Sequence, residues 1–129
     1  MTAATGRPRP AAGARLTIGS VTDSHDDVCW DAFVTAMLAA GPADERPSRY
    51  GSKPALVIEG REIAHLEAPG IIDLRITRRG WSQARPDYAD DPAVRHDRSR
   101  RDWIELHLNS PADLDRLARL LAIAAAENT

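Results

Sequence analysis

The sequence predicts an α+β fold, a two-layer domain in which an antiparallel sheet of about four strands carries an N-terminal and a C-terminal helix on one face. Residues 51–76 hold three short apolar runs separated by glycine or proline, as in a three-stranded antiparallel meander. Residues 103–108 alternate between apolar and other side chains, which adds a fourth strand. Apolar residues at helical spacing precede and follow these strands, so a helix is expected at each end of the domain.

The length of the chain, 129 residues, is that of one domain. Residues 1–20 are rich in Ala, Gly, Pro and Arg, and we expect them to form a flexible tail. Residues 21–129 are then a single domain. A domain of this size buries enough apolar surface to fold without a disulfide or a structural metal.

The first helix is expected from about Asp26 to Ala40, with Ser24 as its N-cap and the Gly-Pro pair at 41–42 as its end. Cys29 lies within this helix. Because it is the single cysteine of the chain, we interpret it as a buried structural thiol. The helix should bury one apolar stripe, which consists of Trp30, Phe33, Val34, Met37 and Leu38.

The meander should follow a polar loop at residues 41–53, with strands at 55–58, 63–66 and 71–76. Side chains alternate between the two faces of a strand. In the second strand this places Ala64 and Leu66 on one face and Ile63 and His65 on the other. In the third strand the apolar face holds Ile72, Leu74 and Ile76, and the opposite face holds Asp73 and Arg75.

Residues 77–101 show little periodicity and contain two prolines, so we expect a long loop in which Trp81 and Tyr88 pack against the domain. The strand at 103–108 should turn Ile104, Leu106 and Leu108 toward the core. A last helix should begin at Ser110, with Pro111 in its first turn and Asp113 in a capping-box position. Its buried stripe consists of Leu114, Leu117, Ala118, Leu121 and Ala124.

The charge of the chain argues against two large classes of partner. A net charge of −2 gives no general attraction to nucleic acid or to anionic membranes, and we expect neither as a partner. A basic run at 95–101 is interrupted by Asp97. No run approaches the roughly 18 apolar residues needed to span a bilayer. The lone cysteine fits a reducing compartment, so we expect the cytoplasm.

The polar face of the predicted sheet is the candidate site. Asp73 and Arg75 lie there, and the fourth strand adds Trp103, Glu105 and His107 to the same face if the two strands pair in suitable register. The same pattern is also typical of a half-buried sheet whose outer face is exposed to solvent and has no binding role. Trp103 favours a contact surface, because exposed tryptophan often marks one.

Metal binding and acid–base catalysis are two further interpretations of the same polar residues. The four histidines form no metal-binding motif, and the one arrangement that sequence suggests combines His65 with Glu105 and His107. We therefore expect neither a metal nor a cofactor. His65 or His96, beside Glu62 or Asp73, has the residue types of a general base; a solvated charge cluster has the same composition.

The segment at residues 48–76 resembles a known family. Its motif residues are Gly51, Gly60, Arg61, Glu62, Ile63, Ala64, His65, Asp73 and Arg75. The C-terminal part adds His96, Trp103, the capped segment 110–113 and the leucines at 114–121. Together these resemble the luciferase-like domain family, small bacterial proteins similar to fungal luciferases. Fungal luciferases oxidise a hydroxylated pyrone with molecular oxygen and need no flavin at that step.

The chain departs from that family pattern at three places. The family generally has His-His or Pro-His where this chain has Arg95-His96, and Ser-Gly before the tryptophan where this chain has Arg101-Asp102. The helix-like segment that usually follows the third strand is replaced here by a proline-broken run, which we expect to be part of the long loop.

The leading functional prediction is a module that binds a small molecule or a partner through the polar face and the 77–101 loop. Its predicted ligand-binding residues are Arg61, Glu62, His65, Asp73, Arg75, Trp103 and His107. The resemblance implies an alternative, a cofactor-independent oxygenase with His65 or His96 as base and Arg75 stabilising a developing enolate. A third alternative is an interaction protein that forms a homodimer through the Trp103 face. Whether the chain is an enzyme stays open.

Overall fold

The computed structural model describes residues 27–49 and 51–129 and confirms the α+β class. The predicted tail at 1–20 and the predicted cap Ser24 lie outside the described residues. The elements, in chain order, are α1 (Val28–Ala40), β1 (Asp44–Pro47), β2 (Pro54–Ile58), β3 (Arg61–Ala68), β4 (Ile71–Arg75), α2 (Thr77–Tyr88), β5 (Val94–His96), β6 (Trp103–His107), α3 (Asp113–Arg116) and α4 (Ala118–Glu127).

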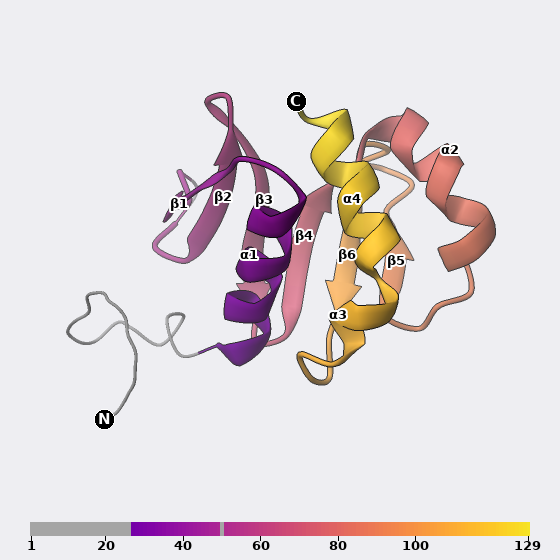
Figure 1. Cartoon of the computed structure of the whole chain (residues 1–129), viewed down its shortest axis with the longest axis horizontal. Helices are drawn as coiled ribbons and strands as arrows, with labels where there is room; N and C mark the ends of the chain where they lie inside the picture. Colours follow the sequence, from indigo (N-terminus) through magenta and orange to yellow (C-terminus); the bar gives the residue numbers. More distant parts are fainter. Residues whose placement is uncertain (1–26, 50) are drawn as a thin grey trace.

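The sheet has six strands in the order β1-β2-β3-β4-β6-β5, and every neighbouring pair is antiparallel. The prediction of about four strands is therefore wrong, because β1 and β5 extend the sheet at both edges. The helices form one layer on one face of the sheet, where α4 lies between α1 and α2 (Figure 1). On the other face of the sheet, residues 27–49 and 51–129 place no helix.

The predicted meander is confirmed as β2, β3 and β4. Glu59 and Gly60 join β2 to β3, both with positive φ (51° and 79°), as a tight hairpin turn with matching twist requires. Gly70, with φ of 73°, turns β3 into β4. A Cβ atom at Gly70 would lie 2.6 Å from the carbonyl oxygen of Leu108, so this turn needs glycine for space as well as for conformation.

The predicted polar loop at 41–53 is wrong in part, because it contains strand β1. All four residues of β1 are exposed, so no apolar periodicity marks it, and it joins the sheet through its backbone pairing with β2. Pro47 is acceptable there because β1 is an edge strand. The Trp30 Nε1 atom on α1 also donates to Glu45 Oε2 at 2.8 Å, which ties β1 to the helix layer.

The predicted long loop at 77–101 is wrong, because its first half is helix α2 and its second half contains β5. Helix α2 buries Gly80, Ala84 and Tyr88, which are four residues apart. Two of these three side chains are very small, so the helix packs on α4 without a visible apolar stripe. Pro86 lies in the last turn, where it interrupts little of the helix. Tyr88 is buried and Trp81 packs against the core, as predicted.

The core lies between the sheet and the helix layer. The predicted α1 stripe is buried except for Leu38, which is 49% exposed, and Cys29 is buried as predicted.

The predicted C-terminal helix is two helices, α3 and α4, which are separated at Leu117. Asp113 Oδ2 accepts from the backbone nitrogens of Asn109 and Ser110 ahead of α3, which is half of the expected capping box. No helix in the described part of the chain is long and apolar enough to cross a membrane.

Candidate functional site

A charged cluster occupies the centre of the helix-free face of the sheet. Three neighbouring strands contribute residues in one row, because His65 on β3 is opposite Asp73 on β4, and Asp73 is opposite Glu105 on β6. Asp73 is only 3% exposed and is the one buried charged residue in the described part of the chain. The row follows from the two-residue period of the strands, which turns Ile72 and Leu74 toward the helices and Asp73 away from them.

Three carboxylates surround the imidazole of His65. The Nε2 atom lies 2.9 Å from Asp73 Oδ2 and 3.2 Å from Glu67 Oε1. The Nδ1 atom lies 3.2 Å from Glu62 Oε2, without the alignment of a hydrogen bond. Glu62 is itself held by Ser48 Oγ at 3.0 Å and by the backbone nitrogen of Arg49 at 3.2 Å. The imidazole thus has carboxylates on both sides.

A bulge in β3 places Glu62 on the face of His65, and a second irregularity of the same strand lies at Glu67. The pairing with β2 passes from Ala64 directly to Glu62 and leaves Ile63 as an extra residue. Without this bulge, Glu62 and His65 would point to opposite faces, since they are three residues apart. The pairing with β4 skips Glu67 in the same way. Ile63 is therefore fully buried in the core, and not on the polar face as strict alternation predicted.

Arg100, from the loop between β5 and β6, closes one side of the cluster. Its Nη2 atom lies 3.3 Å from Asp73 Oδ2, and its Nε atom donates to Asp97 Oδ2 at 3.0 Å. The guanidinium also lies 5.5 Å from the centre of the Trp103 ring, within reach of a cation–π interaction. The Trp103 ring is in turn 5.9 Å from the His65 ring. We call these five residues the His65 cluster: Glu62, His65, Glu67, Asp73 and Arg100.

The electrostatics of the cluster favour the charged forms of both central groups. The hydrogen bond with Asp73 raises the pKa of His65, and burial opposes this shift only in part. Burial tends to raise the pKa of Asp73, but the hydrogen bond from His65 and the charge of Arg100 hold it below its ordinary value. Two buried atoms still have no hydrogen-bond partner, His65 Nδ1 and Asp73 Oδ1.

Five predicted site residues are not members of the His65 cluster; Trp103 borders it, and the other four lie further away. Arg75 is on the same face but donates to Asn128 Oδ1 at 2.7 Å and lies 3.7 Å from Asp102. His107 pairs with Glu105 at 2.7 Å. Arg61 is exposed at the start of β3. His96 is opposite the core residue Ile104, so it faces the helices, where it stacks on Trp81 at 5.1 Å. The cluster thus unites Glu62, His65 and Asp73 beside Trp103 and leaves His96 on the other face.

Sequence reasoning missed two members of the cluster. Glu67 is two residues from His65, so the strand period alone places both on one face, and that signal was present in the sequence. Arg100 belongs to an irregular loop and was grouped with a basic run. No periodicity predicts where a loop side chain lies, and the contact with Asp73 emerges only from the fold.

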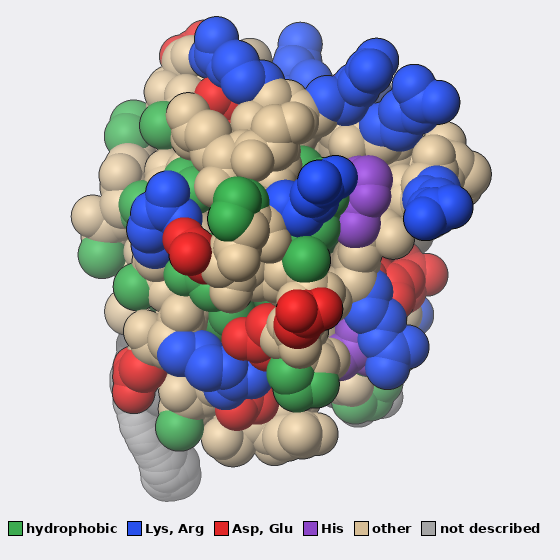
Figure 2. Space-filling model, turned by 90° about the vertical axis from the view of Figure 1, so that its right-hand side faces the viewer, with side chains coloured by type: hydrophobic (Ala, Val, Ile, Leu, Met, Phe, Trp, Pro, Cys, Tyr) green, Lys and Arg blue, Asp and Glu red, His purple; other side chains and the backbone are tan. Residues whose placement is uncertain are grey.

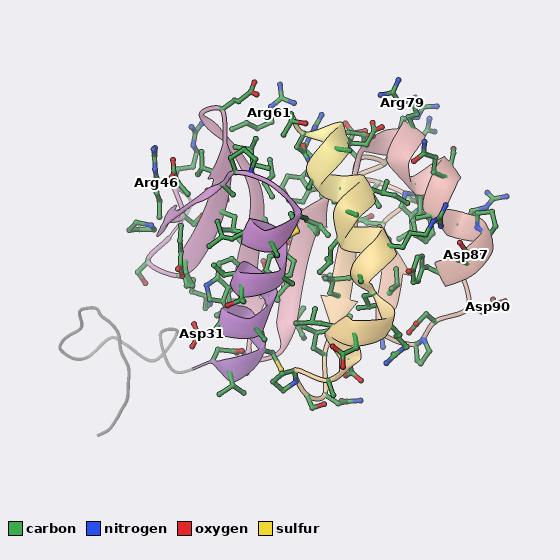
Figure 3. All side chains as sticks on the ribbon, in the orientation of Figure 1. Asp31, Arg46, Arg61, Arg79, Asp87 and Asp90 are labelled. Atoms are coloured by element: carbon green, nitrogen blue, oxygen red, sulfur yellow. The ribbon has the colours of Figure 1, made fainter. Side chains whose placement is uncertain are left out.

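The charges elsewhere on the molecule are dispersed. Asp31, Arg46, Arg61, Arg79, Asp87 and Asp90 point outward around the periphery (Figure 3). Seen from the α2 side, Lys and Arg side chains gather at one end and acidic side chains lie further down (Figure 2). These charges meet solvent, whereas the charge of Asp73 is enclosed.

The helix layer contains a separate groove of about 510 Å³ between α1 and the α3–α4 segment. It is lined mainly by alanines of α1 and by Leu114, Ala118 and Leu121, and Asp115 is its one charged residue. The groove lies on the opposite side of the sheet from the His65 cluster. We assign the chemistry to the cluster, because the groove offers almost no groups that can bind a polar ligand or move a proton.

No protein-family model, curated protein or solved structure matches this chain.

Proposed function

We propose that the protein is a small-molecule-binding module whose binding surface is the helix-free face of the sheet around Asp73. The burial of this aspartate carries the proposal. A charged side chain whose only role was to make the sheet face polar would be exposed to solvent. A buried ion pair often stabilises a protein no more than a well-packed apolar pair does. Asp73 instead keeps one buried oxygen, Oδ1, without a partner, and such an atom destabilises a fold by roughly 1–3 kcal/mol.

The contacts of the cluster suggest the chemical class of the ligand. A hydroxyl or amine group would supply the donor that Asp73 Oδ1 lacks. Trp103, which is partly exposed between His65 and Arg100, offers an apolar surface to a planar ring. A small hydroxylated aromatic molecule combines both features.

A second candidate is a cofactor-independent oxygenase similar to the fungal luciferases. The resemblance of residues 48–126 to the luciferase-like family supports it, and so does helix α2. The family pattern has a helix-like segment after its third strand, and in this chain α2 follows β4 directly. A hydroxylated pyrone, the substrate class of the fungal enzymes, is also a hydroxylated planar ring. The third prediction, a homodimer through Trp103, has no observation that favours it.

The test is a thermal-shift screen of hydroxylated aromatic compounds, pyrones included. A compound that binds only the folded state at 100 times its Kd stabilises it by about 2.7 kcal/mol, which raises the Tm by several degrees. We expect Asp73→Asn to abolish that shift, because the amide fills the acceptor position with a donor. Glu105→Gln, opposite Asp73 on β6, is the matched control and should keep the shift. A screen in which every active compound stabilises all three proteins equally contradicts the proposal.

A further inference from the structure

We propose that His65, Glu67 and Asp73 form a binding site for a divalent first-row transition metal ion, of the class of Zn²⁺. One ligand atom from each residue lies within 4.8 Å of the other two. This inference goes beyond the small-molecule site, because it concerns an inorganic ion and requires no organic ligand. It also differs from the arrangement that the sequence suggested, since Glu105 and His107 have no part in it.

The distances already resemble those of a coordination sphere. Metal bonds of about 2.1 Å place neighbouring ligand atoms about 3.0 Å apart in octahedral geometry and about 3.4 Å apart in tetrahedral geometry. The His65 Nε2 atom lies 2.9 Å from Asp73 Oδ2 and 3.2 Å from Glu67 Oε1. A metal ion would therefore occupy the place of the proton that these three atoms now share. Only the exposed Glu67 side chain has to adjust.

The surroundings of the imidazole have the form that metal-bound histidines usually show. Such a histidine binds the metal through one ring nitrogen and donates the other N–H to a carboxylate. In this chain Nδ1 is buried and lies 3.2 Å from Glu62 Oε2, without the alignment of a hydrogen bond, while Nε2 faces the other two acids. Ser48 and the backbone of Arg49 hold Glu62 in position. Metal binding at Nε2 would leave the proton on Nδ1, beside the one acceptor near it.

A buried and incompletely paired aspartate is the second observation that points to a cation. The Asp73 side chain is 4% exposed, and its Oδ1 atom has no hydrogen-bond partner. Within the described part of the chain, Arg100 is the one arginine or lysine that contacts Asp73, and it lies in a loop with a second partner, Asp97. Arg100 therefore competes with the metal for Asp73, and it can withdraw without losing its own ion pair.

The donor set decides the class of metal. An imidazole nitrogen suits Zn²⁺, Fe²⁺ and Ni²⁺ better than Mg²⁺ or Ca²⁺, which prefer oxygen ligands alone. Three protein ligands leave at least one position open. Glu67 is 53% exposed, so the open position faces solvent on the side where the proposed small molecule binds.

The experiment is a calorimetric titration of untagged, chelator-treated protein with Zn²⁺ alone. We expect one ion per chain. Glu67→Gln should weaken binding at least about ten-fold, since even outer carboxylates of metal sites contribute that much. This variant keeps the fold, because the Glu67 side chain is half exposed. Arg100→Ala should strengthen binding, because it removes the competing charge. Glu105→Gln, beside His107 on the same sheet face, is the matched control and should bind as the wild type does.

Three results would overturn the site: no stoichiometric binding, equal binding by the wild type and Glu67→Gln, or equal weakening by Glu67→Gln and Glu105→Gln. Co²⁺ provides a second readout, because its visible absorption reports a site with nitrogen and oxygen ligands, and Glu67→Gln should lose that absorption. These results are independent of the compound screen. A chain that binds hydroxylated aromatics but no Zn²⁺ keeps the proposed function and loses only the metal.

Discussion

His65 on β3 and Asp73 on β4 stand opposite one another, and their side chains meet at 2.9 Å between Nε2 and Oδ2. Opposed side chains in an antiparallel pair stabilise the pairing of their strands. The β3–β4 hairpin therefore depends on the same contact that forms the centre of the candidate site. Changes to the site are expected to alter stability as well as binding, so each variant needs a control from the same sheet face.

Asp73→Asn should lower the free energy of unfolding by about 1.5–3 kcal/mol, which is the range for a hydrogen bond to a charged group. The substitution keeps the shape of the side chain but leaves His65 and Arg100 facing a neutral amide. Urea denaturation at neutral pH measures the loss. Glu105→Gln should change stability by no more than about 0.5 kcal/mol, because Glu105 is more exposed. Equal losses in the two variants would show that the burial of Asp73 does not increase its contribution to the free energy of unfolding.

Gly70→Ala should destabilise the protein more than Gly60→Ala does. Both glycines have positive φ, and an alanine in that conformation destabilises by roughly 1–2 kcal/mol. At Gly60 a Cβ atom meets nothing within 4 Å, whereas at Gly70 it would lie 2.6 Å from the Leu108 oxygen. That oxygen belongs to the backbone and cannot rotate away. Thermal unfolding of the two variants separates the conformational contribution from the steric one, and identical Tm values would refute the steric contribution.

Asp91 should contribute stability that disappears in acid. Arg116 binds it through two hydrogen bonds of 2.9 Å, and this pairing holds the pKa of Asp91 below its ordinary value of 3.8. A lowered carboxyl pKa gives stability that is present above 3.8 and is lost as the pH falls through the folded-state value. Asp91→Asn should therefore be less stable than the wild type at pH 6.

The difference between Asp91→Asn and the wild type should shrink toward zero as the pH falls through the lowered folded-state pKa of Asp91, where the folded wild type also binds its proton. Chemical denaturation at a series of pH values measures it. The adjacent Asp90→Asn is the control, since Asp90 is exposed and points outward (Figure 3). A difference that stays constant from pH 6 to the acid limit would mean that packing, and not charge, links Asp91 to Arg116.

The predictable parts of the fold are the strands and helices whose apolar side chains recur at the spacing of that element. Alternation identified β4 and β6, and it placed Asp73 and Trp103 on the face away from the helices. Strand β1 carries no such signal because all its side chains are exposed and its backbone forms the pairing. Helix α2 was missed because glycine and alanine at its buried positions look like a break and not like a stripe.

The candidate site was predictable to the extent that it lies on strands. His65, Glu62 and Asp73 were named from the sequence. Glu67 was missed, although it was predictable from the same period. Arg100 was not, because its position depends on a loop between β5 and β6 whose course is decided by tertiary contacts. The bulge at Ile63 is equally invisible in the sequence, since an extra residue in one strand exists only relative to its partner.

The two bulges in β3 make the site sensitive to the number of residues in that strand as well as to their identity. Replacing Ile63 by another apolar residue changes packing and leaves the acids where they are. Deleting Ile63 would restore a regular pleat in which Glu62 is two residues from His65 and still on its face, whereas deleting Leu66 would make Glu67 adjacent to His65 and turn it to the opposite face. The chain could then keep every charged residue of the cluster and still lose one of the carboxylates around His65. Insertions and deletions in this one hairpin are therefore a different class of change from substitutions, and homologous chains that share the site should share the length of this strand.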